Sequence, residues 1–268
     1  MEPVEQTVTP ILSLNDLDYI TNTLDRSFTR FNNEYSLMAK SSLEEKRFGN
    51  ALAFKDKNHP TSNYYNRVIG LSEGDEAHLD EILTWFKKSN LHFTVSLPPH
   101  LQSPTLVSAL YQKGFQLSEP DCLFAAIPKE ANEPNCIQVE KITKNNVSKL
   151  LKLMKQSGGK VLPTQVKKIE KEIVGSRFDF YVVIIDGIAV ARASIFFYEK
   201  TAWLSNAVTL PEFRGLGCHG MLLKTRLNAA FNRGCSLALT DTHFGTTSHR
   251  NILRSGFHLC YMTAEFTW

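Results

Sequence analysis

The chain has 268 residues, of which 43% are hydrophobic, so it is long enough to bury one large core or two smaller ones. The net charge is only +3, with basic and acidic residues interspersed, and the 5 cysteines have no Cys-x-x-Cys spacing, which argues against nucleic-acid binding, a disulfide framework and a metal site. Neither a long apolar run nor a signal-peptide pattern occurs, so we expect a cytoplasmic protein that does not bind membranes.

The N-terminal half contains a regular alternation of predicted strands and helices. Hydrophobic periodicity predicts, in chain order, a strand at 64–71, a helix at 75–90, a strand at 91–97, a helix at 103–115 and a strand at 122–128. The polar stretch PKEANEPN at 128–135, with its two prolines, then separates two apolar regions and is typical of a linker. We therefore place two domains at 1–130 and 136–268.

The C-terminal half begins with a predicted strand at 136–142 and a helix within 143–154, for which Thr143 is the expected N-cap. Three apolar runs over 178–210, separated by an Asp-Gly and a Glu-Lys turn, predict an antiparallel meander. A glycine-rich loop follows, and then a helix to about Asn232, a strand at 236–241, a short helix to Arg254 and a strand from Phe257. Because both halves end in the order strand, helix, strand, helix, strand, we interpret the chain as a tandem duplication of one α/β unit.

The loop PEFRGLGCHG, residues 211–220, fits two glycine motifs. Gly215, Gly217 and Gly220 have the G-x-G-x-x-G spacing of dinucleotide-binding folds, and Arg214 with the first two glycines has the R-G-x-G spacing of a pyrophosphate loop. The dinucleotide interpretation requires a strand that leads directly into the first glycine and further βαβ units after the last one. Four residues precede Gly215 here, and too little chain follows Gly220, so the second interpretation is favoured.

A glycine loop at the start of a helix has a clear physical use. Several backbone N–H groups point into one concavity, and the helix dipole adds positive potential, so that a pyrophosphate can bind there. Glycines allow a close approach of the backbone, and Arg214 supplies a charge-assisted partner for the phosphates. The sequence therefore predicts a coenzyme that carries a pyrophosphate.

Three segments, VTLPEFRGLGCHGMLL, NRGCSLALTD and NILRSGF, resemble the GNAT superfamily of N-acetyltransferases, whose hallmark is R/Q-x-x-G-x-G/A between the fourth strand and the third helix. Arg214 and Gly217 match the first and fourth positions of this motif, whereas His219 stands where a glycine or alanine is usual. The resemblance implies an α/β (α+β) fold with a mixed, mostly antiparallel sheet flanked by helices, in two tandem copies. It also implies that acetyl-CoA is the coenzyme.

The coenzyme contacts implied by the resemblance come from three places. They are the fourth strand at Ala207, Val208 and Thr209, the loop at Arg214, Gly215, Leu216, Gly217, Cys218, His219 and Gly220, and the short helix at Ser248 and Asn251. For the last two residues, capping of that helix is an open alternative.

By this resemblance we expect an N-acetyltransferase that passes an acetyl group directly from acetyl-CoA to an amine in a ternary complex. No acidic trough for a basic protein tail is evident, so we expect a small-molecule amine, and a homodimer is left open. The superfamily often uses a tyrosine as proton donor where this chain has Ile252, so a catalytically silent acyl-CoA-binding or sensing protein is the alternative. Tyr261, Cys260 and Ser248 are all in the right neighbourhood for the donor, and Tyr261 is the chosen candidate, with core packing as its alternative.

Two further groups are interpreted as non-catalytic. The segment SEGDEAHLD, residues 72–80, stands at the corresponding junction of the N-terminal half, and its acids would repel a pyrophosphate, so that half is expected to bind no coenzyme. His243 and His249, near Asp241, lack the nucleophile that a catalytic triad needs and are interpreted as isolated surface histidines.

Overall fold

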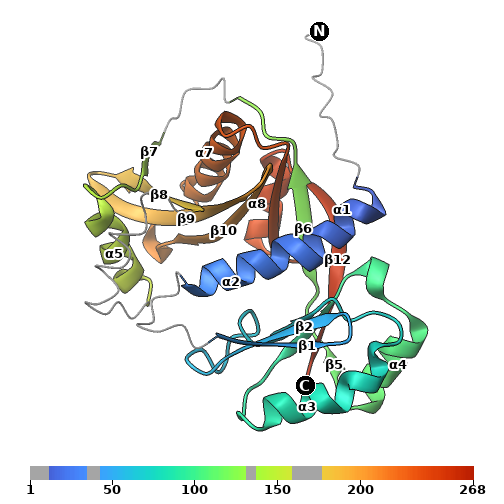
Figure 1. Ribbon diagram of the computed structural model, residues 1–268. Helices are drawn as coiled ribbons and strands as arrows, with labels where there is room; N and C mark the ends of the chain where they lie inside the picture. The colour runs from blue at the N-terminus through green and yellow to red at the C-terminus, as the bar shows by residue number, and fades with distance from the viewer. Residues whose placement is uncertain (1–11, 35–42, 131–136, 159–176) are drawn as a thin grey trace. The chain divides into compact units, whose positions relative to one another are not determined.

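The computed structural model describes residues 12–34, 43–130, 137–158 and 177–268 (Figure 1). They form two compact units: unit 1 contains residues 123–260, and unit 2 contains residues 12–122 and 261–268. Strands β6 (Asp121–Ala126) and β12 (His258–Thr267) each begin in one unit and end in the other. This division differs from the predicted boundaries at 130 and 136, because the end of β12 pairs with a strand of unit 2. Residues 131–136 of the predicted linker lie outside the described residues.

Unit 1 is built on a sheet with the strand order β12-β6-β11-β10-β9-β8-β7. The additional strands are β7 (Gln138–Lys141), β8 (Phe178–Ile185), β9 (Ile188–Tyr198), β10 (Thr201–Thr209) and β11 (Leu237–His243). Strands β7 to β10 are antiparallel to one another, and β10 pairs with β11 in parallel. The predicted meander is confirmed, with its first turn at Asp186 and Gly187, whose φ angles are 49° and 76°.

The described part of unit 1 contains the helices α5 (Val147–Gln156), α7 (Cys218–Asn232) and α8 (Thr247–Arg254). Arg233, the residue that follows α7, contacts side chains of β8 and β9, and these contacts show which face of the sheet α7 covers. Its guanidinium pairs with Asp179 of β8 at 3.0 Å and lies 3.9 Å from the ring centre of Phe197 of β9. The alternate residues Phe178 and Phe196 contact each other on the opposite face, with ring centres 5.0 Å apart.

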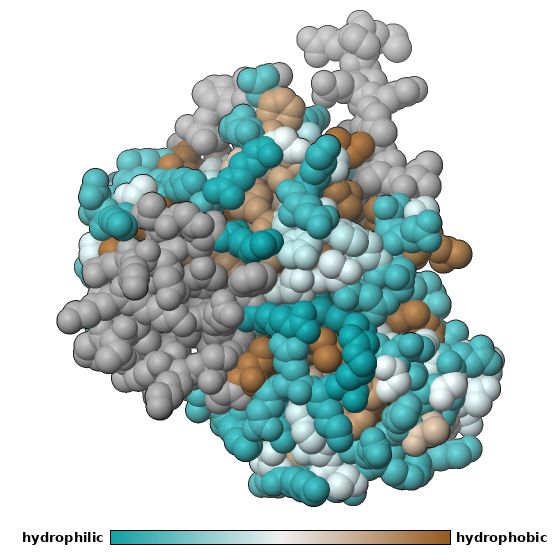
Figure 2. Space-filling view, in the orientation of Figure 1, coloured by the Kyte–Doolittle hydropathy of each residue, from teal (hydrophilic) through white to brown (hydrophobic). Residues whose placement is uncertain are grey.

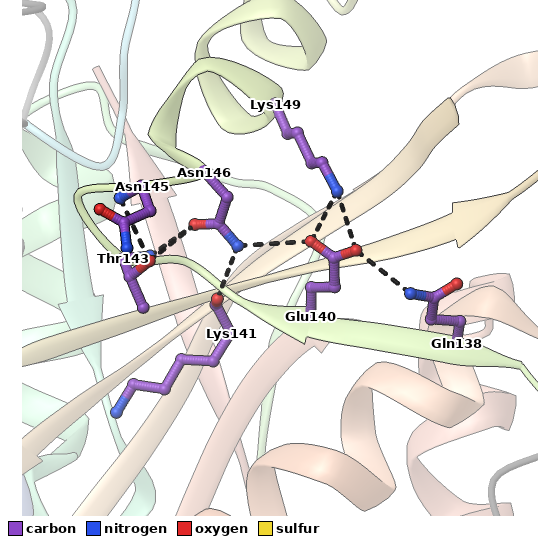
Figure 3. A network of polar contacts seen from close by, with 7 residues as sticks. All are labelled: Gln138, Glu140, Lys141, Thr143, Asn145, Asn146 and Lys149. Carbon is purple, nitrogen blue, oxygen red and sulfur yellow. Dashed lines mark hydrogen bonds and ion pairs between the residues drawn. The ribbon is translucent and has the colours of Figure 1, made fainter. Parts of the chain in front are cut away.

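The junction between β7 and α5 corrects one prediction (Figure 3). Asn146, not Thr143, is the residue before the helix. The Asn146 side-chain oxygen accepts from the backbone N–H of Thr143 at 2.6 Å, and its amide donates to the carbonyl of Lys141 at 3.0 Å. Lys149, one turn into the helix, pairs with Glu140 of β7 at 2.8 Å. These bonds hold residues 143–146 in a turn, so the helix begins one turn later than predicted.

Unit 2 contains a smaller sheet with the order β1-β2-β3-β4-β12. Its strands are β1 (Leu43–Phe48), β2 (Ala51–Asp56), β3 (Arg67–Ile69), β4 (Thr94–Leu97), the short β5 (Gln116–Leu117), which pairs with β12, and the end of β12. Of the described strand pairs in this sheet, only β3 and β4 are parallel. The predicted strand at 64–71 is thus shorter than expected, and the hairpin of β1 and β2 was not predicted.

The helices of unit 2 include two that the sequence predicted and one long segment that it did not. Helix α3 (Leu79–Lys87) follows a 3-10 turn, η2 (Asp75–His78), and α4 (Pro104–Gln112) follows η3 (Pro99–Leu101). The unpredicted segment consists of α1 (Leu14–Tyr19), a π-helical turn, η1 (Ile20–Asp25), and α2 (Arg26–Glu34). The stacked rings of Phe86 and Phe93, with centres 3.9 Å apart, mark the core between the sheet and α3.

On the face drawn in Figure 2, the described hydrophobic residues form small, separate groups among hydrophilic ones. Within the described ranges, no helix is both long and apolar enough to cross a membrane.

Candidate functional site

The glycine loop of unit 1 connects the end of β10 to the start of α7. After the 3-10 turn η4 (Pro211–Phe213), the chain passes through Gly215 and Gly217, whose φ angles are 82° and 80°. Residues with a side chain rarely adopt such angles, so both positions require glycine for the backbone alone. Gly220 has no positive φ and lies within the first turn of α7, so the backbone does not require glycine there.

The loop presents unpaired backbone donors at the start of a 15-residue helix. Among the described residues, none accepts a hydrogen bond from the N–H groups of Gly215 to Gly220, and Met221 is the first to donate, to the carbonyl of Gly217. A Cβ atom built at Gly215 or Gly220 would have no neighbour within 4 Å. The helix start therefore combines free donors, the positive end of the helix dipole and open space, which together suit an anion.

The side chains of the loop differ in exposure. The Arg214 side chain is exposed and makes no hydrogen bond or ion pair with any residue in the described ranges. Leu216 is 53% exposed, whereas Cys218 is buried, with its Sγ 3.8 Å from the carbonyl oxygen of Phe213. Burial raises the pKa of the Cys218 thiol, which disfavours a reactive thiolate. Cys218 therefore packs in the first turn, and its backbone N–H has no acceptor among the described residues.

His219 and Asn251 join the first turn of α7 to α8. Asn251 Nδ2 lies 3.3 Å from His219 Nδ1. Burial, together with the nearby charge of Arg226, lowers the pKa of His219 to about 4, so the imidazole is neutral at physiological pH. Ser248, in the first turn of α8, is partly buried. The capping residue of α8 is Thr246, whose hydroxyl accepts from the His249 N–H, so neither Ser248 nor Asn251 is needed as the cap.

The interpretation of His249 as a surface residue is wrong. His249 is only 9% exposed, and its Nδ1 accepts a hydrogen bond from the N–H of Gly245 at 2.9 Å. The rings of Phe124 and Phe244 lie against the imidazole, with centres 5.3 and 5.0 Å away. His249 thus stabilises the turn between β11 and α8.

Strand β10 leaves its parallel neighbour just before the predicted coenzyme segment. The pairing of β10 with β11 runs from Thr201 to Leu204, where the Thr240 hydroxyl donates to the Leu204 carbonyl at 2.9 Å. Beyond this point β9 is the only described strand that pairs with β10, and a bulge lies between Ser205 and Val208. Asn206, within the bulge, has a φ of 56°, a conformation that Asn tolerates better than most residues. Of the predicted contact residues, Ala207 therefore lies within the bulge, and Val208 and Thr209 follow it, on the part of β10 that is not paired with β11.

Two arginines hold the bulge, and sequence reasoning missed both. Arg226 of α7 donates from Nη1 to the carbonyls of Ser194 and Ser205, at 2.9 and 3.2 Å. Arg192 of β9 donates from Nη1 to the carbonyl of Asn206 at 3.3 Å. The two adjacent carbonyls of the bulge are thus bound by guanidinium groups from two different elements.

The predicted proton donor does not lie in the unit that contains the loop. Tyr261 belongs to unit 2, where its ring centre lies 6.2 Å from that of His100. Ile252, which occupies the position of the usual tyrosine, is 2% exposed and forms part of the core of unit 1. A proton-donating role for Tyr261 stays a prediction.

The corresponding loop of unit 2 is filled by its own carboxylate. Asp75, only 4% exposed, accepts from the N–H of Asn50 at 3.1 Å and from the N–H of Ser72 at 3.0 Å. The Ser72 hydroxyl donates to the same carboxylate at 3.0 Å. Backbone donors that could otherwise bind an anion are therefore occupied by an internal acid.

No model of a protein family matches the chain, and neither does any curated protein. Among solved structures, the chain is similar to a GCN5-related N-acetyltransferase from Kribbella flavida, with a TM-score of 0.65 and 14% identity over 92% of this chain and 95% of that one. A GCN5-related N-acetyltransferase from Sphaerobacter thermophilus gives a TM-score of 0.58 and 12% identity over 84% of this chain and 75% of that one. A tandem GNAT protein from the clavulanic acid biosynthesis pathway gives 0.56 and 13% identity over 96% of each chain. The predicted fold class is therefore confirmed, and the chain has the tandem fold of GCN5-related N-acetyltransferases.

Proposed function

We propose that this protein is an acetyl-CoA-dependent N-acetyltransferase of the GNAT superfamily and that unit 1 binds the coenzyme. The observation that carries the proposal is the loop at residues 215–220, whose unpaired N–H groups open α7 beside the strand edge of β10 that β11 has left. An anionic group and an extended amide chain are the two ligands that these features suit, and acetyl-CoA carries both.

The pyrophosphate would bind at the loop. The N–H groups from Gly215 to Gly220 can each donate to a phosphate oxygen, and Arg214, exposed and free of other described partners, can add a charge-assisted bond. Asn251 would act through His219, and Ser248 offers a hydroxyl from the neighbouring helix. Because His219 is neutral, it adds no charge to this site.

The pantetheine arm would lie along the free edge of β10. Ala207, Val208 and Thr209 offer backbone donors and acceptors there, and Ala207 is exposed. An amide chain beside a strand edge forms the same hydrogen bonds as an added strand. This placement brings the thioester to the bulge, where a backbone N–H could stabilise the oxyanion of the tetrahedral intermediate.

The reaction needs few side chains. The unprotonated acceptor amine attacks the thioester carbonyl, the tetrahedral intermediate expels the coenzyme thiolate, and one proton passes from the new amide nitrogen to that sulfur. Holding the two substrates in line removes much of the barrier. We propose a small-molecule amine as acceptor and retain Tyr261 as a predicted proton donor.

The test uses the purified full chain with acetyl-CoA and a panel of small amines, with NAD as the control coenzyme. We expect acetyl-CoA but not NAD to raise the melting temperature, and free thiol to be released only when an amine is present. Stabilisation by NAD instead would contradict the coenzyme assignment. Stabilisation by acetyl-CoA without thiol release from any amine would contradict the transferase assignment and favour a binding protein.

A further inference from the structure

Arg192 presents an unused hydrogen-bonding edge beside the β10 bulge. Its Nη1 donates to the carbonyl of Asn206 at 3.3 Å. Its Nε is buried without a partner, and Nη2 makes no hydrogen bond with any residue in the described part of the chain. Nε and Nη2 together form the side-on fork of a guanidinium, the edge that binds a carboxylate with two parallel bonds.

Arg192 also lacks an acid to balance its charge. Arg67, which is also partly buried, pairs with Asp25, whereas the buried Arg26 and Arg226 donate to backbone carbonyls. Among the described residues none pairs with Arg192, and burial lowers its pKa. A guanidinium that is partly withdrawn from water without a counter-charge is a costly arrangement, unless a ligand supplies the missing partner.

The side chain of Arg192 lies on the face of the sheet away from α7. Strand β9 pairs with β8 without interruption from Ala191 to Phe196, so Arg192 and Phe197 point to opposite faces. Phe197 contacts Arg233 on the α7 face. The glycine loop opens α7, so a coenzyme bound at this loop approaches β10 from the α7 side. A second substrate must reach the thioester from another direction, and Arg192 lies beside the bulge on the opposite face of the sheet.

Resting on the proposed function, we propose that Arg192 binds a carboxylate of the acceptor, so that the acceptor is an amine that also carries a carboxylate, as an amino acid does. The carboxylate accepts from Nε and Nη2, and the bond from Nη1 to Asn206 holds the fork in place. The amine of the same molecule is thereby kept beside the bulge where the thioester lies.

The test compares the twenty α-amino acids with their α-carboxamides as acceptors, using the full chain and saturating acetyl-CoA. The two sets differ only in whether a carboxylate or a neutral amide is offered. For the preferred acceptor, kcat/KM of the acid should exceed that of the carboxamide by on the order of ten- to a hundred-fold, the worth of a charged hydrogen-bonded pair. In Arg192→Gln this ratio should fall to about one, chiefly through a higher KM for the acid. Arg192→Lys keeps the charge without the fork, so its ratio should lie between those of the wild type and Arg192→Gln.

A matched control is Arg47→Gln, which removes an arginine of unit 2 that also donates one bond to a backbone carbonyl, that of Asn50. It should leave the ratio unchanged. Equal rates for acids and carboxamides, or an unchanged ratio in a folded Arg192→Gln protein, would overturn this inference while leaving acetyl transfer intact. Failure of the wild-type chain to bind acetyl-CoA in a parallel titration would instead overturn the proposed function.

Discussion

The Arg226 guanidinium lies 2.9 Å from the carbonyl oxygen of Ser194 and 3.2 Å from that of Ser205, so one side chain of α7 joins β9 to β10 at the first residue of the bulge. Arg226 is 1% exposed, and its Nε donates to the carbonyl of Leu222 in its own helix at 2.9 Å. Burial lowers its pKa to about 9, so it remains charged at neutral pH. The bulge is thus held by a buried cation.

Replacing Arg226 by Met should loosen the bulge and weaken coenzyme binding. The carbonyls of Ser194 and Ser205 lose a charged donor. We expect the free energy of unfolding to fall by about 2 kcal/mol, because the loss of these buried hydrogen bonds outweighs the gain from no longer burying a charge. The dissociation constant for acetyl-CoA should rise on the order of ten-fold. Urea unfolding and calorimetric titration measure the two effects. Arg254→Met, an exposed arginine of α8, is the control, and equal behaviour of both variants would contradict this role.

His219 should make the stability of the protein depend on acid pH. Its pKa is lowered from 6.5 to about 4, so between these values the unfolded chain binds a proton that the native chain does not. The free energy of unfolding should therefore fall as the pH drops from 6.5 to 4. His219→Gln should lose less stability over this window in urea titrations, whereas the exposed His243→Gln should behave like the wild type. The same loss in His219→Gln and the wild type would count against a buried, neutral imidazole.

Glu265 of unit 2 should make the protein less stable as the pH rises, which is opposite to the effect of His219. Burial raises the pKa of Glu265 from 4.5 to about 8, while the Ser96 hydroxyl, which donates to it at 2.9 Å, and Arg67 work against this shift. Between pH 4.5 and 8 the native chain keeps a proton that the unfolded chain releases, so the free energy of unfolding should fall as the pH rises. Glu265→Gln should be more stable than the wild type at pH 8 and less dependent on pH. A less stable variant at pH 8 would show that Glu265 is ionised in the native state.

One coenzyme should bind per chain, despite the tandem fold. The loop after β3 has its backbone donors occupied by Asp75, which accepts from Asn50 and Ser72. We expect calorimetry to give about one acetyl-CoA bound per chain. Asp75→Asn should give the same value, because the amide oxygen of Asn can still accept a hydrogen bond from the loop. A stoichiometry of two would show that unit 2 also binds acetyl-CoA.

The order of elements in unit 1 was predictable because its signals are local. Apolar runs of strand length are separated by turn residues such as Asp186-Gly187, and α7 ends before Gly234, whose φ is 69°. The segment 14–56 carried no such signal. A π-helical turn at 20–25 interrupts the helical period there, β1 is polar, and every residue of β2 is buried. Periodicity therefore failed in this segment.

The candidate site also has one part that the sequence could predict and one part that it could not. The glycine loop could be found because its conformational requirement is encoded by the glycines themselves. The roles of Arg192 and Arg226 could not, because they depend on carbonyls 14 to 32 residues away in sequence. The pairing of β12 with β4 could not be predicted for a related reason, since the two strands lie far apart in the sequence.

The most direct test of the account is calorimetric titration of acetyl-CoA into the wild type, Gly217→Ala and Gly187→Ala. The two glycines have φ angles of 80° and 76°, so both substitutions cost similar backbone strain, but only Gly217 lies in the proposed phosphate loop. We predict binding by the wild type and Gly187→Ala with a dissociation constant on the order of micromolar, and binding at least about ten-fold weaker by Gly217→Ala. No binding by the wild type, or equal binding by all three proteins, would contradict the assignment of the loop as the coenzyme site.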